Sequence, residues 1–248
     1  MKLKNIFAGV ALAAAATASM ASPITVGGVT WDPDATNAFP VLVDFAAFGT
    51  LFELSTNGVP GDLVTGRGIV NQINSAVANS ASFCQGCELT YTFSMNLVSI
   101  TPGATGLDFS FNNLAVNIFV DSTPDYTGTA ASAADGTPWL SLLGNGNLTG
   151  NGVGIGTGSD AGSGTALLDV VGGLAADNFD TNTKLNGADF VFSSSFQPLR
   201  GAFEGQRQLL VGTFDLQGNS IPEPGSLALL GLGLAGLGFA KRRRNLAK

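Results

Sequence analysis

The stretch ELTYTFSMNLV, residues 88–98, alternates apolar and small polar side chains along most of its length. A period of two places every second side chain on the same face of a strand, so that one face is apolar and the other is polar. Such a strand is half buried, which is typical of antiparallel sheets with one face in water. The pattern commits the centre of the chain to β-structure.

Several other segments show the same tendency. Residues 107–120 alternate in two sets, and Asn112-Asn113 lies between them, where a tight turn or a bulge could shift the register. Further strand candidates, separated by turn-forming residues, are 41–48, 167–171, 188–196 and 209–216. Only residues 69–80 have helix-like spacing, and we expect a short helix there. The chain is therefore predicted to be all-β, as a single antiparallel β-sandwich or jelly-roll-like domain.

Residues 144–164 are unusually rich in glycine, with nine glycines in 21 residues. This is too many for an ordinary helix. The segment could be a mobile surface loop or the flat turns of a solenoid, but the frame of the calcium-binding β-helix repeat is not kept. We expect a mobile loop.

The first 21 residues have the layout of a secretory signal peptide. Lys2 and Lys4 precede an apolar run at residues 6–16, and candidate cleavage sites follow at Ala16-Thr17-Ala18 and Ser19-Met20-Ala21. We assign residues 1–21 to a signal helix and residues 22–220 to a β-rich exported domain.

That exported domain is strongly acidic. The chain has 11 basic and 18 acidic residues, and seven of the basic residues and one acid lie in its two ends, which leaves residues 22–220 with a formal net charge of −13. Nucleic acid and anionic lipid would repel such a body, so we expect no nucleic-acid partner. The chain also has no histidine, which removes the usual general base and the commonest transition-metal ligand.

Residues 221–248 form a three-part segment. Pro222-Glu223-Pro224 cannot continue a strand or a helix, because proline lacks a backbone donor and restricts the residue before it. Residues 225–240 carry no charge, and as a transmembrane helix they would span about 24 Å. Local thinning and snorkelling could match this length to a hydrocarbon core of about 30 Å. The basic cluster that follows would stop the segment on the cytoplasmic side, namely Lys241, Arg242, Arg243 and Arg244.

This layout resembles the PEP-CTERM sorting domain of Gram-negative bacteria. The resemblance is carried by Pro222-Glu223-Pro224, the apolar run and Arg242-Arg243-Arg244, while Ile221 replaces the more usual valine. It implies processing by exosortase, a membrane transpeptidase-like protease, after export through the inner membrane and transient anchoring. It also implies a link to exopolysaccharide export, biofilm and floc formation. It implies nothing about residues 22–220.

Cys84 and Cys87 are the two cysteines of the chain. An oxidising periplasm favours a local disulfide, which would close a tight loop and contribute ~2 kcal/mol or less. A thioredoxin-like redox pair needs a βαβ setting, which the strand-like residues after Cys87 do not supply. A zinc site would need two further ligands.

Pairs of acids that are close in sequence could carry chemistry: Asp32/Asp34, Asp121/Asp125 and Asp177/Asp180. Facing carboxylates could hydrolyse glycosides, and the segments DPDATN (32–37) and DNFDTN (177–182) could bind calcium. Each pair lies among turn residues, as solvated surface acids do. We expect no cofactor, with calcium as the exception that these acids leave open.

Aromatic side chains could form platforms for sugars, the candidates being Trp31, Tyr91, Tyr126 and Trp139. Tyr91 lies on the apolar face of its strand, which favours core packing, whereas Trp139 lies in a turn that enters a strand and is the better platform candidate. We expect Arg67 to face solvent, where it could pair with an acid or meet an acidic polysaccharide.

These features favour an exported, non-enzymatic protein of the cell surface or extracellular matrix, associated with exopolysaccharide and biofilm. The alternatives are a carbohydrate-binding module for the exported polysaccharide and a carboxylate-based glycan hydrolase.

Overall fold

The computed structural model describes residues 22–35, 37–38, 42–74, 76–77, 83–154 and 161–221. Within it, Pro23–Ile221 form one compact unit. This unit is built of strands, with one short helix, α2 (Ala176–Phe179), and one 3-10 turn, η1 (Leu185–Gly187). The predicted signal helix and the predicted C-terminal transmembrane helix lie outside the described residues. Among the residues that are described, no helix has both the length and the apolar character needed to cross a membrane.

Ten strands form one antiparallel sheet. In chain order they are β5 (Phe45–Leu54), β6 (Leu63–Ile73), β7 (Ala76–Val77), β8 (Glu88–Pro102), β9 (Leu107–Asp121), β10 (Thr137–Gly144), β11 (Leu148–Val153), β12 (Ala161–Gly172), β13 (Phe190–Glu204) and β14 (Arg207–Gly218). Two short hairpins lie outside this sheet: β1 (Ile24–Val26) pairs with β2 (Val29–Trp31), and β3 (Asn37–Ala38) pairs with β4 (Leu42–Val43).

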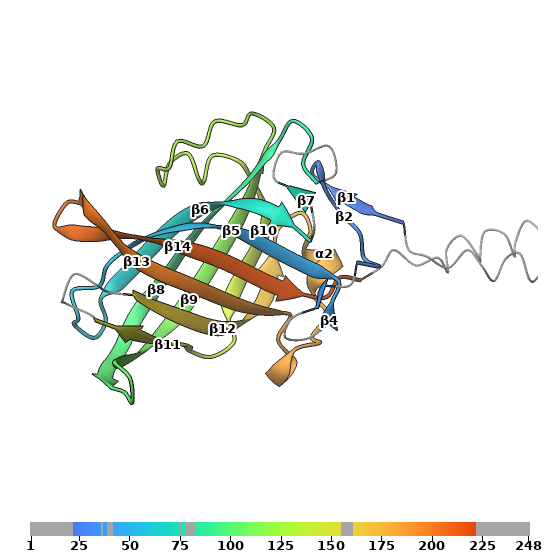
Figure 1. Cartoon of the computed structure of the whole chain (residues 1–248). Coiled ribbons are helices and arrows are strands. Elements are labelled where there is room, and N and C mark those ends of the chain that lie inside the picture. Colours follow the sequence, from blue (N-terminus) through green and yellow to red (C-terminus); the bar gives the residue numbers. More distant parts are fainter. Residues whose placement is uncertain are drawn as a thin grey trace, which may run out of the picture. The chain divides into compact units, whose positions relative to one another are not determined.

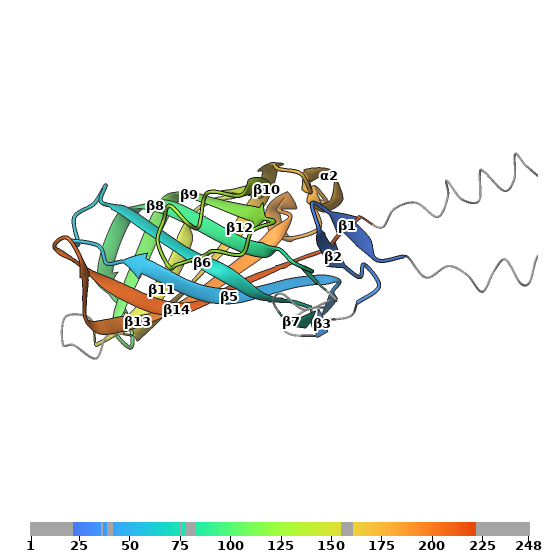
Figure 2. The ribbon, with the colours of Figure 1, turned by 90° about the horizontal axis from the view of Figure 1, so that it is seen from above.

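The large sheet closes on itself around a common interior (Figures 1 and 2). Its strands pair in the order β13, β14, β5, β6, β8 and β9, and β12 then returns to β13. Between β9 and β12, β11 pairs with the first part of β9 and β10 with its last part. The prediction of an all-β antiparallel fold is confirmed. Opposite walls face each other as in a sandwich, but they belong to one closed sheet.

The alternation that predicted β8 also decides which side chains enter the interior. Leu89, Tyr91, Phe93, Met95 and Leu97 are all buried, none with more than 5% of its surface exposed. In the neighbouring β9, Asn113 has a positive φ of 52°, and the register with β8 shifts between Ser94 and Asn96. Of the two alternatives for Asn112-Asn113, the bulge is therefore the one that occurs.

The short helix expected at residues 69–80 is wrong, because β6 runs through Ile73. The backbone of β6 pairs with β5 along most of its length. On its other side it pairs with β8 as far as Ile69 and then with β7 at Gln72 and Ile73. Ile69, Val70 and Ile73 are β-branched, and their branched side chains favour this pleated setting.

The mobile loop expected at residues 144–164 is wrong for the part that the structure describes. Residues 148–153 form β11, and β12 begins at Ala161, while residues 155–160 lie outside the description. The glycines have a packing role, because a Cβ on Gly150 would overlap the ring of Phe109 and one on Gly162 the ring of Phe196. Glycine here makes room for aromatic side chains inside the sheet.

One end of the closed sheet is filled by a plug, which we define as the β1–β2 hairpin, α2 and the aromatic side chains between them. Trp31 stacks on Phe179 with ring centroids 4.9 Å apart, and Phe45 contacts Phe179 at 4.6 Å. The backbone amide of Ile221 donates to the carbonyl oxygen of Asn178 in α2, at 2.8 Å. The described body therefore begins and ends at the plugged end, as Figures 1 and 2 show.

Candidate functional site

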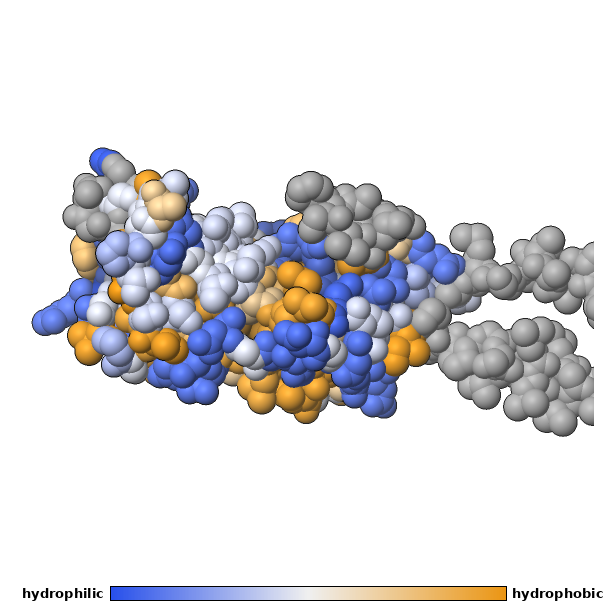
Figure 3. Space-filling model, turned by 90° about the horizontal axis from the view of Figure 1, so that it is seen from below, coloured by the Kyte–Doolittle hydropathy of each residue, from blue (hydrophilic) through white to orange (hydrophobic). Residues whose placement is uncertain are grey.

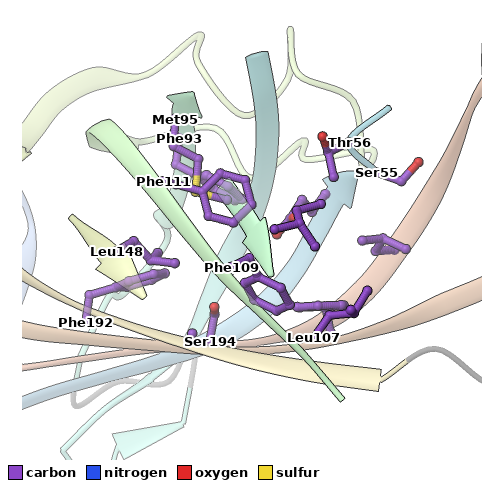
Figure 4. A pocket seen from close by; sticks show the side chains of 15 residues that line it. Ser55, Thr56, Phe93, Met95, Leu107, Phe109, Phe111, Leu148, Phe192 and Ser194 are labelled. Carbon is purple, nitrogen blue, oxygen red and sulfur yellow. The ribbon is translucent and has the colours of Figure 1, made fainter. Parts of the chain in front are cut away.

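A cavity of 270 Å³ lies in the interior on the side away from the plug. Its wall is mostly apolar and rich in aromatic rings, with five phenylalanines and one methionine, namely Phe93, Met95, Phe109, Phe111, Phe192 and Phe196. These side chains come from β8, β9 and β13 and converge on one space (Figure 4). The polar side chains in the wall are Glu53, Ser55, Thr56 and Ser194. A partly enclosed, aromatic cavity with few polar groups is the usual form of a small-molecule site.

The position of Glu53 follows from the alternation of β5. This strand begins at Phe45 in the plug and ends beside the cavity, and Leu51 and Glu53 fall on its inner face. Leu51 is fully buried in the core. Glu53 therefore occupies the next inward position, where an apolar side chain would be expected.

Glu53 is a buried acid without a partner. It is 7% exposed, and no hydrogen bond or ion pair joins its carboxyl group to any residue that the structure describes. Burial alone raises the pKa of Glu53 from 4.5 to about 8. At neutral pH the carboxyl group is thus mostly protonated, and it can both donate and accept a hydrogen bond.

Tyr91 is a buried titratable residue whose pKa is influenced by Glu53. Its pKa is raised well above 10, first by burial and then by the charges of Tyr126 and Glu53. Its hydroxyl group donates to the carbonyl oxygen of Thr50 at 2.6 Å, and its ring stacks on Phe214 at 4.2 Å. Tyr91 is therefore fixed in the core and remains neutral.

Sequence reasoning missed Glu53. The signal was present, because residues 45–54 place Ala47, Gly49, Leu51 and Glu53 at alternate positions. Glu53 follows these three small or apolar residues on the same face of the strand, and this position would have indicated a buried carboxyl group. The strand predicted at residues 41–48 ended before Glu53, whereas β5 extends to Leu54.

The structure brings one of the predicted acid pairs together with a third acid. Carboxylate oxygens of Glu88, Asp121 and Asp125 lie within 4.8 Å of one another. Glu88 is buried, and burial raises its pKa. Its two oxygens already accept the backbone amides of Asp125 and Tyr126, each at 3.2 Å. Carboxylate oxygens of this kind could hold a divalent cation. Both oxygens of Glu88, however, already accept hydrogen bonds from the backbone.

The two predicted calcium segments do not gather acids in the same way among the described residues. Asp32 accepts the backbone amide of Asp34 at 2.9 Å, which is a local turn contact. Asp180 accepts the side-chain amide of Asn182, also at 2.9 Å. Both contacts are typical of surface turns.

Three of the four predicted sugar platforms are buried, whereas Tyr126 remains half-buried. Trp139 and Tyr91 are fully buried, and Trp31 is 2% exposed. Arg67 was expected to face solvent, which is wrong: it is 8% exposed, pairs with Glu204, and donates from Nε to the carbonyl oxygen of Gly128 at 2.6 Å. Arg67 thus joins three distant segments of the chain.

Cys84 and Cys87 form a close pair, with Cα atoms 5.3 Å apart. This spacing suits a disulfide. The bond in the exported protein stays a prediction. The loop that carries the pair contacts the plug, because the backbone amide of Thr30 donates to the carbonyl oxygen of Phe83 at 2.8 Å.

A second hollow among the described residues, of 510 Å³, is more open and more polar than the cavity, and Asp108, Thr149 and Asn151 are among the residues that line it. Figure 3 shows apolar residues in separate patches divided by hydrophilic ones. The exposed large apolar side chains are spread over several strands, among them Leu143, Val171 and Val191. Scattered residues of this kind are normal for a protein surface. The interior cavity is therefore the candidate site of the described residues.

Comparison with known proteins identifies only the C-terminal segment. The family model of the PEP-CTERM protein-sorting motif matches residues 220–244. The match covers Pro222, Glu223 and Pro224 and the cluster Lys241 to Arg244, all of which lie outside the described residues after Ile221. No curated protein and no solved structure matches the chain. The predicted sorting segment is confirmed, and it indicates an exported protein of Gram-negative bacteria that is processed by exosortase, a membrane enzyme.

Proposed function

We propose that this protein is an exported, non-enzymatic component of the cell surface or extracellular matrix that holds a small apolar molecule inside its closed sheet. The observation that carries the proposal is the aromatic cavity of 270 Å³. A cavity of about 150 Å³ lined by apolar side chains is large enough for benzene, so this one can hold roughly ten carbon atoms.

The sorting motif supports the proposed location. The match at residues 220–244 indicates delivery through exosortase, which the resemblance links to exopolysaccharide export and biofilm. An exported matrix protein with such a cavity would carry or store a small molecule where the polysaccharide is laid down. Association with the exopolysaccharide itself is part of the proposal.

Binding is favoured over glycan hydrolysis by the make-up of the cavity. Glycosidases need two carboxyl groups on either side of the scissile bond, separated by about 5–10 Å. Among the described residues, the cavity wall contains one carboxyl group, that of Glu53. A single protonated acid can bind a polar group but lacks the second carboxyl that this chemistry uses.

The carbohydrate-binding alternative has less support from the geometry. Sugar platforms need exposed aromatic faces, and both tryptophans of the chain are buried. Polysaccharide contact would have to use other surface groups.

The test uses phenylpropanol, a neutral molecule of about the size that the cavity can hold. The full chain is kept in solution by an amphipathic polymer, and binding is measured by titration calorimetry. Ser194→Phe fills the cavity, whereas Ser193→Phe makes the same change one residue away on the outer face of β13. We expect binding by the wild type and by Ser193→Phe, and none by Ser194→Phe. Equal binding by the two variants would show that the molecule sits elsewhere and would contradict the proposal.

A further inference from the structure

Glu53 sets a requirement on whatever fills the cavity. The residue is 7% exposed, its carboxyl group lies in the cavity wall, and this group has no partner among the described residues. The cost of desolvating this acid is therefore not incurred again when a ligand binds. A ligand group that pairs with the carboxyl group gains a contact that the empty protein leaves unmade.

The aromatic wall adds a second preference. Phe93, Phe109 and Phe111 are among five phenylalanines around the cavity, and their labelled rings lie around the same space (Figure 4). The faces of aromatic rings carry partial negative charge and attract cations within about 6 Å. A carboxyl group and several phenylalanine side chains in the same cavity wall therefore favour the binding of an apolar molecule with a positive charge.

The negative net charge of residues 22–220 also favours a cationic ligand. Residues 22–220 have a formal net charge of −13, which raises the local concentration of cations and repels anions. A fatty acid or another apolar anion would meet both this field and the buried acid. An apolar cation meets neither obstacle.

We infer that the cavity binds an apolar amine in its cationic form, an inference that rests on the proposed ligand-holding role. The ammonium group would lie against Glu53 and the apolar body against the phenylalanine rings. The ligand class is thus a small organic amine of roughly ten non-hydrogen atoms. Ser55, Thr56 and Ser194 are the other polar groups of the wall. Ser55 and Thr56 already accept the backbone amides of Gln208 and Gly58, so the Ser194 hydroxyl is the group that can accept a further hydrogen bond from the ammonium group.

Binding of such a ligand involves a proton. The empty protein holds Glu53 mostly as the neutral acid at pH 7, because its pKa is about 8. When the ammonium ion enters, the carboxyl O–H bond breaks, the proton leaves to the solvent, and an ion pair remains. No electrons are transferred, and binding becomes tighter as the pH rises towards the pKa of Glu53.

Other charged groups near β5 do not interfere with this titration. On the flanking strands, Arg67 of β6 is paired with Glu204, and Arg207 of β14 is paired with Asp62. Asp215 of β14 lies on the outer face, where it accepts from the side-chain amide of Gln217. Tyr91 faces inward but remains neutral, because its pKa is raised well above 10.

The experiment compares phenylpropylamine, phenylpropanol and phenylpropanoate, which share one apolar body. Each is titrated calorimetrically into the full chain, kept in solution by an amphipathic polymer, at pH 6, 7 and 8 in two buffers of different ionisation enthalpy. We expect the amine to bind most tightly and its affinity to rise about 50-fold between pH 6 and 8, in proportion to the ionised fraction of an acid with a pKa near 8. We also expect up to one proton to be released at pH 7.

Two variants assign the effect to Glu53. Glu53→Gln removes the charge and keeps the shape, so the amine should lose its pH dependence and bind at least tenfold more weakly at pH 8. Asp135→Asn makes the same charge change at an exposed loop position and should behave as the wild type. The alcohol should bind both variants about equally.

The outcomes separate this inference from the proposed function. If the alcohol binds as tightly as the amine at every pH, or if Glu53→Gln leaves amine binding unchanged, the cationic ligand class is wrong while a ligand-holding cavity stands. Tighter binding of phenylpropanoate would have the same consequence. If none of the three binds, the inference and the proposed function both fail.

Discussion

Trp139 in β10 donates a hydrogen bond from its indole nitrogen to the carbonyl oxygen of Val26, at 3.0 Å. The contact joins residues 113 positions apart and ties the β1–β2 hairpin to the inner face of the closed sheet. It holds the plug in place, so the open part of the interior lies towards the far end. The two tryptophans of the chain differ in this respect, because Nε1 of Trp31 is buried and has no hydrogen-bond partner in the part of the chain that the structure describes.

The difference predicts unequal effects of the same substitution. Trp139→Phe removes the donor to the part-buried Val26 oxygen, whereas Trp31→Phe removes an N–H group that has no partner among the described residues. Both lose similar volume. We expect Trp139→Phe to be the more destabilising by about 1–2 kcal/mol in the free energy of unfolding, measured by denaturant titration. A larger loss for Trp31→Phe would contradict the role given to the Trp139 contact.

Glu53 should make stability fall as the pH rises. The unfolded chain loses this proton near pH 4.5, while the folded protein keeps it until about pH 8. The stabilising effect is therefore fully present below pH 4.5 and is lost progressively up to about pH 8, at roughly 1.4 kcal/mol per pH unit. Glu53→Gln should flatten the fall and be more stable than the wild type at pH 8. Thermal unfolding of both proteins from pH 4 to 8 measures the difference, and parallel curves would argue against a buried acid.

Gly66 should not tolerate a side chain. It faces Phe93 across β6 and β8, and a Cβ there would overlap the phenylalanine ring and approach the carbonyl oxygen of Phe52. We expect Gly66→Ala to cost about 1–3 kcal/mol in unfolding free energy, as overpacking does. Gly172→Ala is the matched control, because nothing lies within 4 Å of the added Cβ. A comparable loss in both variants would mean that the cost is not steric.

Replacing Pro222, Glu223 and Pro224 by alanine should block C-terminal processing. The matched family segment contains these residues, and exosortase would no longer recognise its substrate. Intact mass measured in the membrane and in the medium should show that the unprocessed form accumulates in the membrane. Changing Lys248 to alanine, outside the matched segment, serves as the control. Normal processing of the triple variant would refute the role of the motif.

Six strands could be predicted at least in part, because each carries its own alternation or apolar run, namely β5, β8, β9, β12, β13 and β14, whereas β6, β10 and β11 could not. β8, for example, reveals its inner face through Leu89, Phe93 and Leu97. Closure of the sheet could not be predicted in this way, since it depends on the pairing of β12 with β13 and of β14 with β5. The second of these pairings joins segments more than 150 residues apart, and no local pattern specifies a partner at that distance.

The structural roles of two kinds of residue could not be predicted from the sequence, for the same reason. Glycines such as Gly150 and Gly162 indicate a loop when only local backbone freedom is considered, but in the fold they leave space for Phe109 and Phe196. Glu53 is typical of a solvated strand end until the strand is followed into the interior. In both cases the neighbours that give the residue its meaning lie on other strands.

The body begins and ends beside α2, where Ile221 is bound to Asn178, and the cavity opens at the other end. Ile221, the last described residue, therefore lies at the end of the body opposite to the cavity. If the proposed ligand-holding role is right, cleavage after Ile221 leaves every described residue of the cavity wall in the protein, so the same ligand should bind before and after processing.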